Sequence, residues 1–271
     1  MNPILITIGG IDIRWYSVLI LIGAFMVLLM SQNEANRFGM TREFIFNALF
    51  WALILGVIGA RLYYCVFNLD IYLKDPIEIV KIWKGELAIH GGLIFGLITL
   101  ALYCKKYKVR LIRMLDFIVV PLLLAQAIGR WGNFFNQEAH GAVTTIETLK
   151  ALFIPDFIIE GMTIDGIVYT PTFLYESIVC FVSFIILLFV RRSKYLKVGS
   201  LTGAYLLIYG VLRFFIEMSR TDALMLGGFK VAQIVSVIMV IIAVGIFMFN
   251  SRKAKFDDLY NDSNNINEIK F

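Results

Sequence analysis

Residues 111–141 read LIRMLDFIVVPLLLAQAIGRWGNFFNQEAHG. The stretch up to Ile128 is mostly apolar, and the part from Gly129 to Gly141 holds an arginine, two asparagines, a glutamine, a glutamate and a histidine. An apolar run of this length is close to the roughly 20 residues that a helix needs to cross a bilayer. The stretch therefore predicts a membrane span that carries an unusual density of hydrogen-bonding groups at one end.

The composition extends this prediction to the whole chain. Hydrophobic residues make up 59% of the 271 residues and charged residues 17%, and the mean hydropathy is +0.80. Soluble domains carry roughly 25% charged residues. Because lipid cannot satisfy backbone polar groups, each long apolar stretch should be a helix. We expect an all-α integral membrane protein with seven transmembrane helices, approximately at Trp15–Met30, Phe44–Phe67, Leu87–Cys104, Leu111–Ile128, Thr172–Val190, Gly199–Glu217 and Val231–Phe249.

The basic residues predict the orientation. Lysines and arginines are concentrated in the connections 105–110 and 191–197 and at 252–255, and such clusters mark the cytoplasmic side. The connection between the second and third spans is mixed, since Lys74 and Lys84 lie among acidic residues such as Glu86. We expect the N-terminus outside the membrane and the C-terminus in the cytoplasm. The net charge of +5 suits an anionic lipid surface, and no basic face with aromatics indicates a nucleic-acid partner.

The longest connection, between the fourth and fifth predicted spans, has local signals of order. Thr144 to Glu147 has capping-box spacing and predicts a short helix that reaches Phe153. Asp165-Gly166 between short apolar runs predicts a two-residue hairpin. We therefore predict a small outer cap at 142–170 on a membrane domain of residues 1–254. The Asn- and Asp-rich tail, 255–271, is predicted to be a disordered cytoplasmic end.

On this topology the polar residues that are costly to place in lipid fall at one depth of the bilayer. A charged side chain inside a span costs at least about 2.5 kcal/mol, so it is a functional candidate. The outer half of the bilayer collects four arginines and one histidine. Because a guanidinium binds phosphate oxygens in a fork, this layer predicts a site for an anionic lipid headgroup. The residues are Arg61, Arg130, Arg213, Arg220 and His90, of which His90 is the candidate proton acceptor.

Two structural alternatives remain open at this point. Arg213 and Glu217 are spaced i, i+4 and could form a local pair that only neutralises two buried charges. The segment from Arg130 to His140 could continue as helix, or its glycines could make it bend or re-enter the membrane. At the opposite end of the fourth span, Arg113 and Asp116 are interpreted as a structural pair. His140 is interpreted as a loop residue.

The motifs also resemble a known family. GRWGNFFNQEAHG, residues 129–141, resembles the signature of the bacterial prolipoprotein diacylglyceryl transferases. The resemblance covers nearly all of the chain outside the cap and the tail. It continues, in family order, through IRWYSVLILIG, GARLYY, IHGGL, PTFLYE and YGVLRFFIEMSRTD.

The resemblance implies an activity and roles for particular residues. Members of the family transfer the diacylglyceryl group of phosphatidylglycerol to the lipobox cysteine of a prolipoprotein signal peptide, forming a thioether and releasing glycerol phosphate. No metal or organic cofactor is implied. By motif, His90 and Arg213 would be essential, and Arg130 and Asn133 would hold the lipid phosphate. The site would also be lined by Tyr16, Asn136, Glu138, Glu217 and Arg220.

The chain departs from the family pattern at one position. The family usually has histidine-proline ahead of its tyrosine-glutamate pair, whereas this chain has Thr170-Pro171 before Tyr175 and Glu176.

Competing functions leave different traces in a sequence. A transporter would predict paired broken helices in internal repeats, and a metal-dependent phosphatidyltransferase would need clustered aspartates. The sequence has neither pattern. A non-catalytic lipid-binding protein would leave His90 and Glu138 unexplained. The three cysteines lie in or at the ends of predicted spans without CxxC spacing, and we expect buried structural thiols.

Overall fold

The computed structural model describes residues 1–73, 75–81, 87–220, 225–226 and 228–262. Lys84 and Glu86 of the mixed connection, Thr221 and Asp222 of the last motif, and the tail from 263 lie outside these ranges. The chain forms two compact units. Unit 1 comprises residues 1–30 and 115–262, and unit 2 comprises residues 31–114. Each unit is described by itself.

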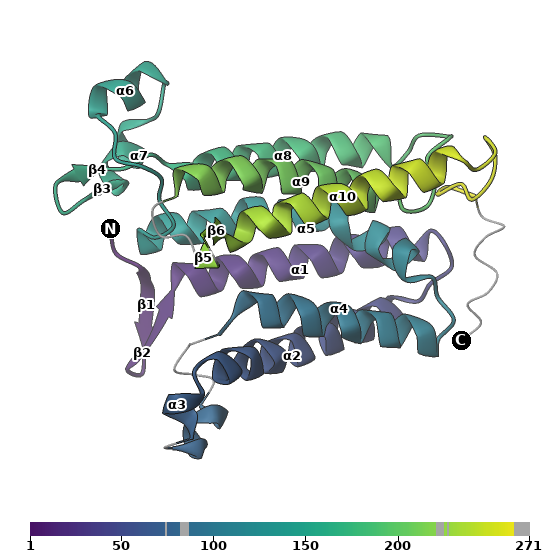
Figure 1. The fold of residues 1–271 in the computed structure, drawn as a ribbon, viewed down its shortest axis with the longest axis horizontal. Helices are drawn as coiled ribbons and strands as arrows, with labels where there is room; N and C mark the ends of the chain where they lie inside the picture. The colour runs from purple at the N-terminus through teal and green to yellow at the C-terminus, as the bar shows by residue number, and fades with distance from the viewer. Residues whose placement is uncertain (74, 82–86, 221–224, 227, 263–271) are drawn as a thin grey trace. The chain divides into compact units, whose positions relative to one another are not determined.

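The seven predicted spans are confirmed as helices. The described residues contain seven helices that are long and apolar enough to cross a bilayer, so the chain is a multi-pass membrane protein of the all-α class. Figure 1 labels them. They are α1 (Trp15–Asn36), α2 (Arg42–Phe67), α4 (Ile89–Lys106), α5 (Leu111–Asn136), α8 (Thr172–Val190), α9 (Ser200–Ser219) and α10 (Val231–Ser251).

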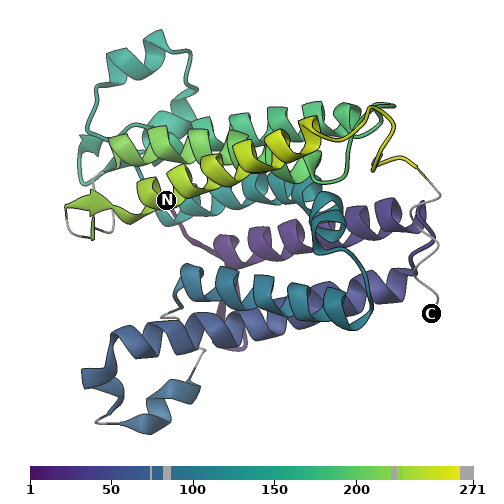
Figure 2. The same ribbon diagram turned by 45° about the vertical axis from the view of Figure 1, so that its right-hand side comes forward.

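The remaining elements are short. Among the described residues, antiparallel pairs of strands join β1 (Ile4–Ile8) with β2 (Ile11–Arg14), β3 (Thr163–Ile164) with β4 (Ile167–Val168), and β5 (Met225–Leu226) with β6 (Phe229–Lys230). The short helices are α3 (Leu69–Tyr72), η1 (Pro76–Val80), α6 (Ile146–Ala151) and α7 (Asp156–Gly161). In unit 1, α8, α9 and α10 run side by side, as Figures 1 and 2 both show.

The cap follows its local sequence signals closely. Asp165 and Gly166 both have positive φ, 50° and 79°, which matches the predicted two-residue hairpin turn. The helix signal is displaced by one position, because the hydroxyl of Thr145, not Thr144, accepts the Thr148 N–H (3.2 Å). The pKa of Glu147 lies below its usual value, because the Glu147 carboxylate accepts hydrogen bonds from the Glu147 backbone N–H and from the Thr145 hydroxyl. Helix α6 ends at Ala151 instead of reaching Phe153.

The cap is fixed to the helices by its own apolar core. Leu149, Ile158 and Met162 from the cap pack with Phe134 of α5 and Phe173 of α8, and all five are nearly inaccessible to solvent. The rings of Phe134 and Phe173 stack at 4.7 Å between centroids. The cap is therefore an ordered extension of the ends of α5 and α8.

In unit 2, close packing of α2 and α4 positions the start of α4. A Cβ atom on Gly91 would lie 2.5 Å from the carbonyl oxygen of Gly59, so only glycine permits this approach. The Ala88 N–H also donates to the Ala60 carbonyl (3.1 Å). These contacts fix the first turn of α4, where His90 lies.

The tail differs from the sequence-based expectation over residues 255–262. Tyr260 is fully buried and its ring lies 6.1 Å from that of Phe117. The Tyr260 N–H donates to the Leu196 carbonyl (2.6 Å), and the Val198 N–H donates to the Asp258 carbonyl (2.9 Å). Composition alone could not predict this order, because the backbone partners come from the connection before α9. Disorder of the last nine residues, 263–271, stays a prediction.

Asp116 of α5 has a structural role at the start of α9, and its pairing with Arg113 stays a prediction. Its carboxylate is 1% exposed and accepts hydrogen bonds from the N–H of Gly199 (2.5 Å), the N–H of Thr202 (2.8 Å) and the Thr202 hydroxyl (2.6 Å). It thereby satisfies donors at the start of α9, where the helix has no side-chain cap of its own.

We predict that Asp116→Ala lowers the free energy of unfolding by about 3 kcal/mol, because it leaves buried donors at the start of α9 unpaired. Thermal unfolding in detergent measures the change. Asp156→Ala is the control, since that carboxylate is 76% exposed and forms a surface ion pair with Lys150. Equal unfolding midpoints for Asp116→Ala and the parent would contradict the capping role.

Candidate functional site

A buried carboxylate joins the charged residues of unit 1. Glu176 lies near the start of α8, and its side chain is only 2% exposed. Its Oε1 atom is 2.5 Å from Nη2 of Arg130, and its Oε2 atom is 3.6 Å from Nη1 of Arg213. The Tyr209 hydroxyl donates to Oε1 (3.3 Å). One carboxylate thus lies between guanidinium groups from α5 and α9.

The same network continues along α9. Arg213 Nη2 is 2.6 Å from Oε2 of Glu217, and Arg220 Nη1 is 4.0 Å from that oxygen. The local Arg213–Glu217 pair that the spacing allowed is therefore present. Through Glu176 it is also connected to Arg130, so it belongs to a larger cluster.

Two buried atoms of the charged cluster are available for further hydrogen bonds. Within the described residues, Arg213 Nη1 and Glu217 Oε2 are buried atoms that make no hydrogen bond, although both belong to ion pairs. The Arg213–Glu217 contact is therefore close but outside hydrogen-bond geometry. A buried donor without an acceptor is costly. Arg213 can consequently donate to an incoming oxygen without first losing a hydrogen bond at Nη1.

The backbone of the signature stretch combines the two forms that the sequence left open, helical as far as Asn136 and bent after it. Helix α5 runs without interruption to Asn136, so this part of the signature is helical. Gln137 and Ala139 then adopt left-handed conformations, with φ of 53° and 56°. The Glu138 N–H donates back to the Asn133 carbonyl (3.0 Å). The chain therefore reverses over the end of α5 and returns Glu138 to the last helical turn.

This reversal brings the polar side chains of the signature together. The Asn133 and Asn136 amides both donate to Oε1 of Glu138, at 3.0 and 3.3 Å. Asn133 in turn accepts a hydrogen bond from Arg130 Nη1 (3.3 Å). Glu138 is thus linked to the Arg130–Glu176 pair through one amide side chain.

The start of α1 packs against the same helical turns. A Cβ atom on Gly132 would lie 2.6 Å from the Tyr16 ring, so the second glycine of the signature makes room for that ring. The rings of Trp15 and Phe135 stack at 4.8 Å. Tyr16 is therefore held beside the signature turn of α5.

Two predicted site residues belong to unit 2. Arg61 is 2% exposed, and it donates to the carbonyl of Ile79 through Nε (3.1 Å) and to that of Glu78 through Nη2 (2.6 Å). Its guanidinium also lies 5.2 Å from the centre of the Tyr72 ring. His90 is half-buried, with its ring 6.4 Å from that of Tyr63. Arg61 thus anchors the η1 segment to α2.

Two further residues make contacts in or beside the cap. His140 is a loop residue, as expected, and its ring lies 3.9 Å from that of Tyr169. Thr170 donates from its hydroxyl to the Ala142 carbonyl (2.9 Å). In this chain position 170 closes a turn of the cap.

Sequence reasoning did not list Glu176 and Tyr209 among the site residues. The signal for Glu176 was available, since it is a charge inside a predicted span, but its two arginine partners come from other helices.

The polar network also reaches further into the bundle. Gln126 Nε2 donates to the Tyr205 hydroxyl (2.9 Å), and the Tyr205 ring lies parallel to that of Tyr209.

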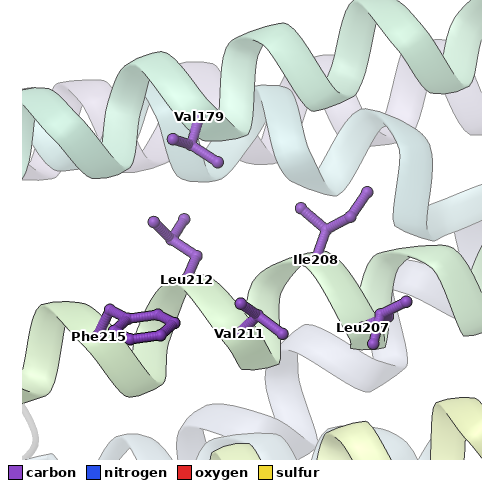
Figure 3. Close-up of a pocket in the computed structure, with 6 residues that line it drawn as sticks. All are labelled: Val179, Leu207, Ile208, Val211, Leu212 and Phe215. Atoms are coloured by element: carbon purple, nitrogen blue, oxygen red, sulfur yellow. The ribbon is translucent and has the colours of Figure 1, made fainter.

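A separate groove in unit 1 is entirely apolar. It has a volume of about 480 Å³ and lies between α8 and α9, where Figure 3 shows side chains of both helices pointing into it. Leu212 lines the groove and the next residue, Arg213, points about 100° away around α9. The side chains that line the groove are therefore all apolar, and the groove is separate from the charged cluster of Arg130, Glu176 and Arg213. Its lining residues are Val179, Leu207, Ile208, Val211, Leu212 and Phe215.

The described residues contain no cluster of three or more His, Cys, Asp or Glu side chains that could hold a metal ion. Cys65, Cys104 and Cys180 are buried free thiols, as the sequence predicted.

Comparison with known proteins assigns the family. The sequence model described as prolipoprotein diacylglyceryl transferase matches residues 3–249. The chain belongs to the prolipoprotein diacylglyceryl transferase family. The resemblance seen in the motifs is thereby confirmed over nearly the whole chain.

Curated relatives support this assignment, and each is named phosphatidylglycerol–prolipoprotein diacylglyceryl transferase. The Listeria monocytogenes serotype 4b protein is 44% identical over 253 residues, covering 93% of this chain and 91% of the relative. The Staphylococcus saprophyticus protein is 42% identical over 258 residues, covering 95% and 91%. The Bacillus velezensis protein is 40% identical over 264 residues and covers 97% of both chains.

We predict that Glu176→Gln lowers the free energy of unfolding by about 3 kcal/mol, because it removes the charge that neutralises two arginines inside a span. Thermal unfolding in detergent measures the effect. Glu160→Gln, at an exposed position of the cap, is the matched control and should unfold like the parent. A Glu176→Gln protein as stable as the control would show that this carboxylate is not needed to hold the arginines.

Proposed function

We propose that this protein transfers the diacylglyceryl group of phosphatidylglycerol to the lipobox cysteine thiol of prolipoproteins, the first step of lipoprotein maturation. The family membership over residues 3–249 supports the reaction type and the substrates named for the relatives. The observation that carries the proposal is the joining of signature residue Arg130 to Arg213 through Glu176. Two guanidinium groups held this close suit a phosphate diester.

The proposed reaction is a displacement at carbon. The cysteine sulfur attacks the CH₂ carbon of the diacylglyceryl group that is bonded to a phosphate oxygen, a C–S bond forms, and the bond between that carbon and the phosphate oxygen breaks. Glycerol phosphate leaves with the bonding electrons, and the thiol proton passes to a base. The site must therefore supply a proton acceptor and cations for the growing phosphate charge.

We assign the phosphate to Arg130 and Arg213. Arg213 brings the buried Nη1 atom that makes no hydrogen bond within the described residues, and Arg130 is oriented by Asn133 and Glu176. A preorganised guanidinium stabilises developing negative charge more than water does, because it needs no reorientation during the reaction. Arg220 and Glu217 complete the charged face of α9.

We propose supporting roles for the remaining residues. Glu138, Asn136 and Tyr16 line the site beside Asn133, and their contacts at the end of α5 support this assignment. For Arg61 we propose a positioning role, since its donors hold the backbone of the η1 segment. The assignment of His90 as base rests on the family motif and on the near-neutral pKa of imidazole in general.

We further propose that the protein lies in a bacterial plasma membrane with its N-terminus outside. The basic clusters at 105–110, 191–197 and 252–255 support this orientation. It places the ends of α5 and α9, and with them the charged cluster, in the outer leaflet. Phosphatidylglycerol would then enter from the surrounding bilayer.

We predict that Arg130→Ala lowers the rate of transfer by at least about 100-fold, since it removes a charged donor to the leaving phosphate. Purified protein is incubated in detergent with phosphatidylglycerol and a lipobox peptide, and glycerol phosphate release and the peptide mass are followed. Arg252→Ala, an exposed arginine at the other end of unit 1, is the control and should keep parent activity.

The same assay separates the alternatives. A thioether-linked diacylglyceryl peptide formed by the parent and by Arg252→Ala, but not by Arg130→Ala, would support the transferase. Binding of phosphatidylglycerol without any modified peptide would refute it in favour of lipid binding or transport. Formation of a new phospholipid instead of a modified peptide would indicate a phosphatidyltransferase.

We predict that His90→Gln lowers the transfer rate by about 100-fold or more while phosphatidylglycerol binding is retained, because only the proton acceptor is removed. Binding of a labelled lipid and turnover are measured on the same preparation. His140→Gln removes the other histidine of the chain, which stacks on Tyr169 in the cap, and should keep activity. Full turnover by His90→Gln would refute the base assignment.

A further inference from the structure

The end of α6 places an aromatic residue where helices usually place glycine. The Ile154 N–H donates to the Leu149 carbonyl and the Phe153 N–H donates to the Lys150 carbonyl, both at 3.0 Å. This pair of bonds is a Schellman motif, whose left-handed position is commonly glycine. Here it is Phe153, with φ of 57°. A bulky side chain in this conformation is strained.

The strain is not offset by burial of the ring. Phe153 is 93% exposed and the preceding Leu152 is 56% exposed. The residues on either side are fixed, since Leu149 and Ile154 are 1% and 9% exposed and belong to the core of the cap. The tip, residues 152–153, is therefore held outward by its buried neighbours. An aromatic tip in water would lower the stability of the cap without any contact in return.

The position of α6 indicates what covers this tip. Figures 1 and 2 both show α6 projecting past α8, on the side away from α5 and α10. Exposed apolar side chains of α8, such as Phe181 (49%) and Ile186 (52%), mark its lipid-facing surface. Helix α6 therefore extends beyond the edge of the unit, near the end of α8 where the span begins.

The neighbouring residues have the composition of a membrane-interface segment. Val143 is 64% exposed and Ile146 43% exposed, and the Lys150 side chain is 60% exposed. Lys150 is paired with Asp156 (3.4 Å), and exposed apolar side chains beside such charged groups suit the boundary between headgroups and acyl chains.

We propose that the tip of α6, residues 152–153, inserts into the headgroup and acyl-chain boundary of the bilayer beside α8. The ligand of this surface is the lipid interface itself. The tip thereby fixes the height of the cap above the membrane. Since Phe134 of α5 belongs to the same core as Leu149, this contact also supports the end of α5 that carries the signature. The inference does not depend on the proposed reaction.

A depth measurement tests the proposal directly. Phe153→Cys is labelled with an environment-sensitive fluorophore and the full-length protein is reconstituted into phosphatidylcholine vesicles containing phosphatidylglycerol. The native cysteines are at most 5% exposed, so labelling of the parent measures the background. We expect blue-shifted emission and strong quenching by lipids that carry a nitroxide near the headgroup.

The matched control is Asp165→Cys, at the β3–β4 turn of the same cap. This position is also exposed and also has a positive φ, 50° against 57°, so the backbone strain of the two variants is alike. Its label should show water-like emission and weak quenching. Equal quenching at both positions would overturn the proposal. Water-like emission at position 153 that shifts only when a lipobox peptide is added would also overturn it, in favour of a peptide contact.

A second variant separates membrane contact from cap stability. Phe153→Gly relieves the left-handed strain, so the thermal unfolding midpoint should stay the same or rise. A label on Leu152→Cys should nevertheless be quenched less in the Phe153→Gly background than in the parent background, because the ring that anchors the tip is gone. Unchanged quenching in that background would contradict the role of Phe153.

Discussion

Two arginines from neighbouring membrane spans cannot be buried side by side unless a counter-charge lies between them. Glu176 supplies that charge for Arg130 and Arg213, and its position near the start of α8 fixes what the neighbouring helices must do. The end of α5 and the end of α9 have to reach the same depth as the beginning of α8. The uninterrupted course of α5 to Asn136 meets this requirement.

The charge balance of the cluster bears on turnover. Arg130, Arg213 and Arg220 face Glu176 and Glu217, so the guanidinium groups are largely neutralised before any anion arrives. A phosphate must compete with these carboxylates, and it binds less tightly than it would to arginines without partners. Uniformly tight binding would not raise the rate of a chemical step. An arrangement that exchanges partners suits an enzyme that must also release a charged product.

Local signals account for the parts of the fold that were predicted. An apolar run fixes a span because the cost of exposing backbone polar groups to lipid is decided within the run itself. The Asp165-Gly166 turn is local in the same way, since both residues must adopt positive φ. The order of residues 255–262 escaped prediction because Tyr260 owes its burial to Phe117 and to the backbone of Leu196, which a reading of the tail alone cannot supply.

The sequence by itself determined the membrane class and the seven spans, because length and hydropathy depend on neighbouring residues only. It could not decide whether the signature is helical, nor that Glu176 pairs with both arginines. Those outcomes depend on distances between α5, α8 and α9. Only the tertiary structure sets such distances, since burial converts a set of charges at one depth into specific partners through the need to neutralise each of them.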